Sequence, residues 1–171
     1  PRGGIEAELT GQLEDLGATV VFRTEGLSLD SNYSAQIVTK QFRLEKEPRL
    51  LWLTPPGMRD HLNEFSGPTA LVDALIAISK QTPSPENPSG VRISGSLTFT
   101  EGQAAYDDFP YPLQQLAGTV AFDGDQVIVR GITGRGPTGA SVFVQATFNE
   151  AIAMDLDITL ADVPFDNYVM E

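Results

Sequence analysis

The fold of this chain is decided by Val91–Leu160, which reads VRISGSLTFTEGQAAYDDFPYPLQQLAGTVAFDGDQVIVRGITGRGPTGASVFVQATFNEAIAMDLDITL. Apolar and polar side chains alternate through this stretch, most regularly in Val91–Thr100 and Ile152–Leu160. Successive side chains of a β-strand point to opposite faces, so the alternation indicates strands with one dry and one wet face. That pattern is typical of antiparallel sheets, and we predict a mainly β protein.

Turn signals divide the stretch into separate strands. Asp123-Gly124 is typical of a tight hairpin. Glu101-Gly102 also predicts a turn, and Gly134–Gly139 predicts a glycine-rich one. The strands expected between these turns are 91–100, 103–107, 117–122, 126–130, 142–148 and 152–160.

Three further strands are expected near the start of the chain. Ile5–Leu13 alternates apolar and acidic or polar residues, and Ala18–Arg23 follows a glycine with a β-branched run. Tyr33–Val38 predicts a third strand.

The middle of the chain predicts one or two helices between residues 55 and 80. Ala70–Lys80 contains no helix breaker, and one helical face would carry Leu71, Leu75 and Ile78. A shorter helix is indicated upstream by apolar residues at i, i+4 and i+7, namely Met58, Leu62 and Phe65. Gln81–Gly90, with three prolines, is expected to form a loop.

Together these elements predict a single β-rich module or fragment over 1–171. It would consist of first strands in 1–53, a helical insert and linker in 54–90, and the main antiparallel meander in 91–171. The amphipathic strands are expected to form an antiparallel sheet. The length of 171 residues suits one domain. The chain begins at Pro1 without a methionine, and we expect it to be part of a longer protein.

Charge and composition restrict the classes of function. The formal net charge is −12, and the 11 basic residues form no cluster, which argues against a nucleic-acid partner and against electrostatic docking on anionic membranes. There are no cysteines, so disulfides, thiolate metal sites and cysteine nucleophiles are excluded. No run of apolar residues is long enough to span a bilayer.

No catalytic or metal-binding motif is convincing. Gly134–Gly139 spells GxGxxG, but a strand pattern follows it, whereas a dinucleotide site needs a helix there. His61 is the sole histidine, and no GxSxG serine accompanies it. Asp123 with Asp125 lacks the further oxygen ligands of a calcium loop. We expect no enzyme activity, no cofactor and no metal.

One family resemblance stands out, and it covers roughly residues 91–166 and weakly 5–30. Its motifs are Tyr106-Asp-Asp-Phe-Pro-Tyr-Pro112, Gly118-Thr-Val-Ala-Phe-Asp-Gly124 and Ala161-Asp-Val-Pro-Phe-Asp166. The spacing of these motifs between strands resembles the repeating modules of the AsmA-like proteins, which are kin of TamB and YhdP.

The resemblance implies a long curled sheet with an apolar trough. Its parent protein would be anchored in the inner membrane and would reach through the periplasm of the cell envelope. Such proteins are thought to move phospholipids towards the outer membrane or to maintain its lipid balance. Expected partners are a phospholipid or another acyl-chain lipid and neighbouring modules of the same chain. The candidate lining residues, which share strand parity, are Ile93, Leu97, Phe99, Val120, Phe122, Val142, Val144, Phe148, Met154, Leu156 and Ile158.

Two alternatives stay open from the residues alone. The apolar face could be covered by a second sheet instead of by lipid. Such a β-sandwich could bind glycans or proteins through loops around Phe109–Pro112 and Gly134–Gly139. A hydrolase using His61 is a third reading.

Overall fold

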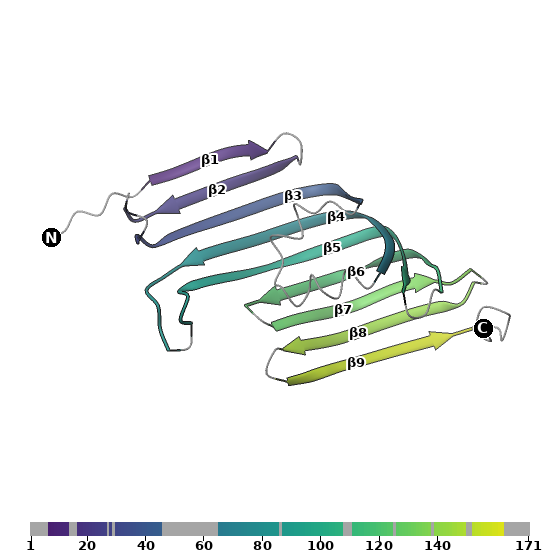
Figure 1. Ribbon diagram of the computed structural model, residues 1–171. Coiled ribbons are helices and arrows are strands. Elements are labelled where there is room, and N and C mark those ends of the chain that lie inside the picture. Colours follow the sequence, from purple (N-terminus) through teal and green to yellow (C-terminus); the bar gives the residue numbers. More distant parts are fainter. Residues whose placement is uncertain are drawn as a thin grey trace.

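The computed structural model describes residues 7–13, 17–26, 28, 30–45, 65–85, 87–107, 111–124, 126–137, 139–149 and 152–162. These residues form one sheet of nine strands, which lie in the order of the chain (Figure 1). The strands are β1 (Ala7–Leu13), β2 (Ala18–Thr24), β3 (Tyr33–Glu45), β4 (Phe65–Lys80), β5 (Val91–Tyr106), β6 (Leu113–Asp123), β7 (Gln126–Arg135), β8 (Ser141–Asn149) and β9 (Ile152–Ala161).

Every consecutive pair of strands is antiparallel, so the sheet is a simple meander. It does not close on itself, and β1 and β9 form its two edges. The predicted mainly β, antiparallel fold is confirmed. None of the described segments is helical, and so none provides a helix able to cross a membrane.

The predicted helix at Ala70–Lys80 is wrong, because these residues belong to the strand β4. Their sequence fits the period of a helix and also that of a strand. Val72, Ile76 and Ile78 are apolar and are separated by even numbers of residues, so all three would lie on one face of a strand. Pairing decides between the two. β4 lies between β3 and β5, which satisfy its backbone groups on both sides and favour its β-branched residues. In the shorter predicted helix, Met58 and Leu62 lie outside the described residues, and Phe65 begins β4.

The expected turn at Glu101-Gly102 is also wrong. β5 runs unbroken through it, and the two residues form a β-bulge with Glu101 at a φ of 54°. The other turns are confirmed. Asp123 pairs with Gln126 around Gly124, whose φ is 57°, and Gly134–Gly139 spans the end of β7 and the connection to β8. Gln81–Gly90 connects β4 to β5 as a loop.

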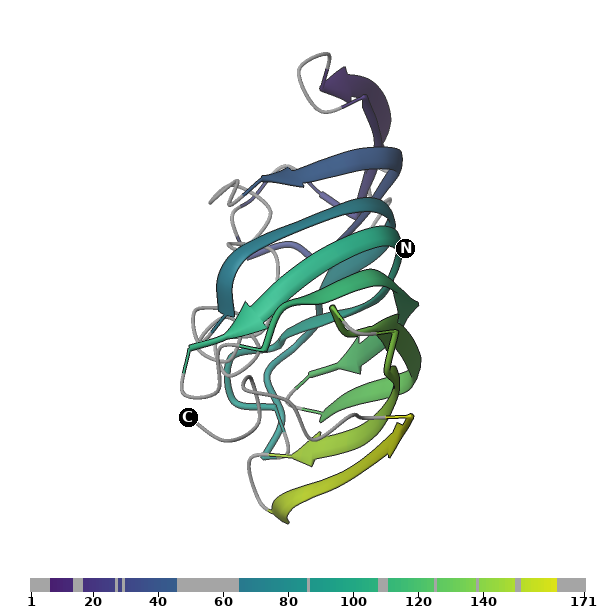
Figure 2. The same cartoon turned by 90° about the vertical axis from the view of Figure 1, so that its right-hand side faces the viewer.

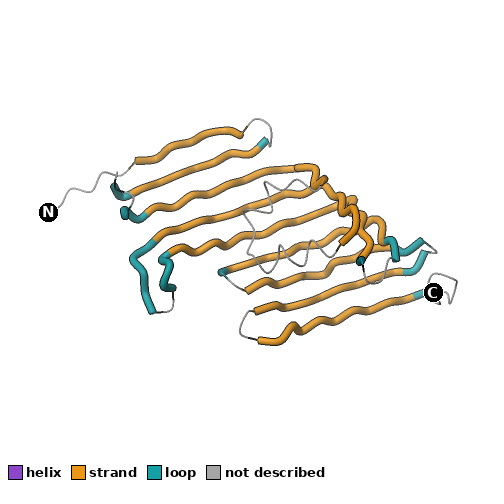
Figure 3. Tube along the Cα trace, viewed as in Figure 1, coloured by secondary structure: helices purple, strands orange, loops and turns teal. Residues whose placement is uncertain are grey.

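Bulges in the central strands bend the sheet. Four strands each place one residue in the left-handed region, namely Gln41 in β3, Glu101 in β5, Gln115 in β6 and Gly131 in β7. All four lie next to shifts in strand register, where an extra residue bends and twists a strand. Figure 2 shows the resulting curl of the sheet. In Figure 3 the strands bend at the end of the sheet where β5 is connected to β6.

One bulge is held by a side chain of the next strand. The Asp73 carboxylate of β4 accepts a hydrogen bond from the Gln41 backbone N–H at 2.7 Å. A backbone donor that the bulge takes out of the ladder is thereby satisfied by a charged acceptor.

Candidate functional site

Strand register assembles one apolar face from β2 to β9. Residues that pair across antiparallel strands share a face, so the pairings trace rows over the sheet. One row crosses eight strands and reads Ala18, Thr39, Ala74, Leu97, Val120, Val129, Ala146 and Leu156. The neighbouring row reads Val20, Ile37, Ile76, Gly95, Phe122, Val127 and Phe148. We call the face made of these and parallel rows the apolar face.

The bulges keep this face apolar along the bent strands. Ile37 and Thr39 lie on it at odd positions of β3, whereas Phe42 and Leu44 lie on it at even positions. The extra residue at Gln41 shifts the alternation of side chains by one position, from odd to even residue numbers. A strand without the bulge would turn Phe42 and Leu44 to the opposite face.

Two glycines in the rows accommodate large neighbours. Gly95 is paired with Phe122, and Gly118 lies against Ile132, whose Cγ1 atom would be 2.8 Å from a Cβ at Gly118. A Cβ atom at Gly95 would lie 2.8 Å from Cζ of Phe122, so the ring occupies the space that a side chain would need. Pairing an aromatic ring with a glycine across strands pins the register of a curved sheet.

Burial falls off towards the β9 edge. Ile76 is 1% exposed and Phe122 3%, and together with Val120 and Val127 they form the centre of the apolar face. On β9 the same face continues with Ile158 and Leu160, which pair with Val144 and Val142 but are 52% and 56% exposed. The described strands supply no second sheet over this edge.

The structure brings most of the predicted lining residues together. The residues placed on the apolar face by register are Ile93, Leu97, Phe99, Val120, Phe122, Val142, Val144 and Ile158. Phe148 and Leu156 occupy positions in the same rows, opposite Val127 and Ala146. Met154 lies in β9. The side chains of Phe148, Met154 and Leu156 lie outside the described part of the structure.

Sequence reasoning missed the part of the apolar face that β2, β3, β4 and β7 contribute. The face also contains side chains of β2–β4 and β7, among them Val20, Phe22, Ile37, Val72, Ile76, Ile78, Val127 and Val129. The signal for β4 was present in the spacing of Val72, Ile76 and Ile78, but the same segment also fitted a helix.

The opposite face is mainly polar and carries an ion pair. Arg92 of β5 donates to Asp123 of β6 from Nε at 2.6 Å and also from its terminal nitrogen, so the pair is bidentate. The hydrogen bonds from Arg92, helped by its charge, hold the pKa of the Asp123 carboxyl below its ordinary value, and Asp123 in turn raises the pKa of Arg92. Both side chains are exposed, so the pair contributes little to stability.

The loops considered for glycan or protein recognition meet in the structure. Tyr111 packs against Gly136, where a Cβ would lie 2.5 Å from its Cε1 atom, and the Tyr111 hydroxyl oxygen is buried. Its ring therefore serves internal packing. Phe109 and His61 lie outside the described residues. All nine described strands belong to one sheet, so they do not form the two packed sheets of a sandwich.

Within the described segments, no group of three or more histidine or acidic side chains is placed to hold a metal ion. No family model, curated protein or solved structure matches the chain significantly. The apolar face is therefore the feature from which a function has to be argued.

Proposed function

We propose that the chain is a non-catalytic lipid-binding module whose apolar face receives the acyl chains of phospholipids. The observation that carries this proposal is the continuity of the apolar face, which register extends from β2 to the exposed Ile158 and Leu160 of β9. Removing an apolar surface of this extent from water is favourable. An acyl chain can cover it because the chain needs no hydrogen-bond partner there.

The curl of the sheet supports the same proposal. A bent sheet with one apolar face surrounds an elongated apolar ligand better than a flat one, and the bulges of β3–β7 produce the bend (Figure 2). The unclosed edges β1 and β9 would pair with neighbouring modules of a longer chain, which would continue the face. Such a protein would act in the cell envelope, between the inner and outer membranes, as the resemblance to AsmA-like modules implies.

Lipid retention tests the proposal. The protein is purified without detergent, extracted with organic solvent, and the extracted lipids are identified and counted by mass spectrometry. We expect phospholipid in a stoichiometric amount. The double variant Ile158→Glu with Leu160→Glu places two charges on the exposed end of the apolar face and should reduce the retained lipid severalfold.

The matched control is Thr159→Glu with Ala161→Glu, which adds the same two charges to the opposite face of the same strand. It should retain as much lipid as the parent protein. Equal loss in both double variants, or no lipid in the parent protein, would refute the proposal.

A further inference from the structure

A single basic residue among the described strands lies on the apolar face. Lys80 follows Ile76 and Ile78 at the same parity at the end of β4, where it is paired with Tyr33 of β3 and Val91 of β5. The other basic residues of the described strands lie on the opposite face. Lys40 follows Thr39 of the apolar face by one position in β3. Register places the rest there, namely Arg23, Arg43, Arg92, Arg130 and Arg135.

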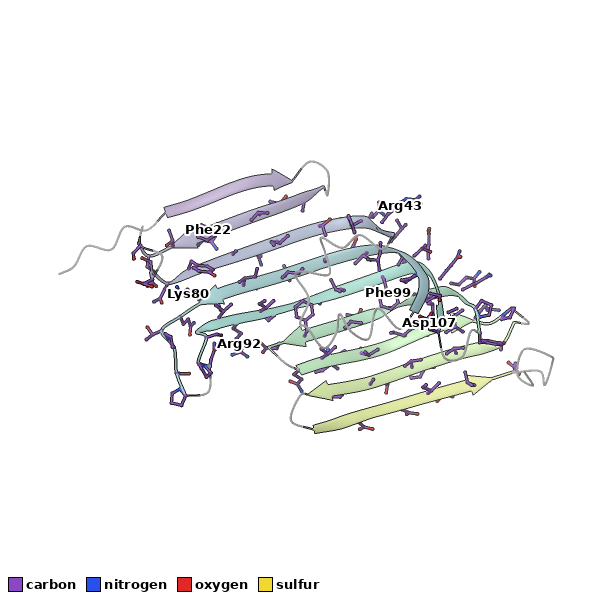
Figure 4. The ribbon with its side chains drawn as sticks, viewed as in Figure 1. Phe22, Arg43, Lys80, Arg92, Phe99 and Asp107 are labelled. Carbon is purple, nitrogen blue, oxygen red and sulfur yellow. The ribbon has the colours of Figure 1, made fainter. Side chains whose placement is uncertain are left out.

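The residues around Lys80 change the apolar face from purely apolar to amphipathic. Ile78 and Ile93 lie one step inside the face, and Val91 is 36% exposed at its rim. Tyr33 packs its ring against Phe22, with 5.7 Å between the ring centroids. Lysine and tyrosine each combine an apolar body with a polar tip, which suits them to the boundary between hydrocarbon and a polar group. Figure 4 shows Lys80 and Phe22 at the same end of the sheet.

We propose that Lys80 and Tyr33 bind the phosphate group of an anionic phospholipid whose acyl chain lies on the apolar face beyond Ile78. This inference rests on the proposed function and adds the chemistry of the headgroup and its place. Lys80 already makes an interaction within the protein, but an ammonium group has three donors and can serve a phosphate oxygen as well.

The net charge of the chain opposes the binding of an anionic lipid. With a formal charge of −12, the field of the whole molecule repels anionic ligands. A preference for an anionic lipid over a zwitterionic one must therefore come from a local cation, and the apolar face offers Lys80.

Binding of two monomeric lipids tests this. Lysophosphatidylglycerol and lysophosphatidylcholine of the same chain length, both below their critical micelle concentrations, are titrated into the lipid-stripped protein by calorimetry. Both lipids offer a phosphate to Lys80, but only lysophosphatidylcholine also carries a quaternary ammonium, which the Lys80 ammonium repels. We therefore expect the anionic lipid to bind roughly fivefold to tenfold more tightly. Lys80→Gln should abolish the difference while lysophosphatidylcholine still binds, and Lys80→Arg should restore it.

Lys40→Gln removes the same charge from the opposite face and should leave the preference intact. Circular dichroism and thermal unfolding confirm that each variant folds. If both lipids bind the parent protein equally, or if Lys80→Gln keeps the preference, the role of Lys80 is overturned and lipid binding stands. If neither lipid binds, the proposed function fails as well. If inorganic phosphate displaces the anionic lipid and binds as tightly as that lipid does, the acyl chain contributes nothing to binding and the inference is wrong.

Discussion

At the scale of single residues, the apolar face depends on where glycine lies next to a large side chain. The phenyl ring of Phe122 covers Gly95 of the neighbouring strand, and both lie in the row that contains Ile76 and Val127. A Cβ atom at Gly95 would also approach the Leu75 carbonyl oxygen to 2.4 Å. Because that oxygen is part of the backbone of β4, it cannot yield as a flexible side chain would.

Gly95→Ala should therefore destabilise the protein by about 1–3 kcal/mol, the usual cost of overpacking a core. Urea unfolding followed by tryptophan fluorescence or circular dichroism measures the change. Gly11→Ala in β1 is the matched control, since nothing lies within 4 Å of its added Cβ, and its effect should stay within about 0.5 kcal/mol. Equal effects of the two substitutions would show that Gly95 is not closely packed.

A titration at the β5–β6 ion pair gives a second prediction at this scale. The hydrogen bonds from Arg92 keep the pKa of Asp123 below its ordinary value of 3.8. A carboxyl whose folded pKa is depressed adds stability above its unfolded pKa, and this is lost as the pH falls through the folded pKa. Arg92→Gln should raise the pKa of Asp123 towards 3.8, as followed by carboxyl carbon shifts in NMR.

Arg43→Gln, on β3 and remote from the pair, should leave that titration unchanged. High salt should bring the pKa of Asp123 in the parent protein closer to its ordinary value, because the pair is exposed and screened. A titration of Asp123 that Arg92→Gln does not shift would mean that the bidentate contact does not persist in solution.

At the scale of secondary structure, the period of two predicted most strands but not β4. The hairpin at Asp123-Gly124 and the strands β8 and β9 follow directly from local sequence. Ala70–Lys80 fits both a strand and a helix, and only the pairing with β3 and β5 decides between them. Long-range pairing is not visible in a single segment, which is why propensity failed there.

The bulges were hidden for a related reason. Gln41 and Gln115 adopt left-handed backbone conformations without being glycine, asparagine or aspartate, so nothing in their sequence marks them. Glu101-Gly102 did give a signal, but the sequence could not distinguish a bulge from a turn. Since a bulge changes strand parity, Phe42 and Leu44 could not be placed on the apolar face from the sequence.

Two alanine substitutions in β4 discriminate the strand from the helix. In the strand, Ile76 is 1% exposed on the apolar face and Leu75 is 43% exposed on the other. Ile76→Ala should cost about 2–5 kcal/mol of unfolding free energy, and Leu75→Ala less than about 1 kcal/mol. A helix would instead bury Leu75 with Leu71. Denaturant unfolding of both variants gives the comparison, and a larger loss for Leu75→Ala would contradict the strand.

At the scale of the whole molecule, the sheet is a meander with one continuous apolar face and two open edges (Figure 1). Its centre is buried, and its β9 end is exposed at Ile158 and Leu160. Asp155 and Asp157 lie on the opposite face of β9 and place like charges along this edge, which discourages β9 from pairing with a second copy of itself.

Photo-crosslinking tests the central claim most directly, namely that the apolar face contacts acyl chains. A phospholipid with a diazirine in its acyl chain is bound, irradiated, and the adducts are mapped by peptide mass spectrometry. We predict adducts at exposed residues of the apolar face, Ile158, Leu160 and Val91, and none at Phe143, which is 37% exposed on the opposite face. Adducts at Phe143 equal to those at Ile158 and Leu160, or no adducts at all, would contradict the account.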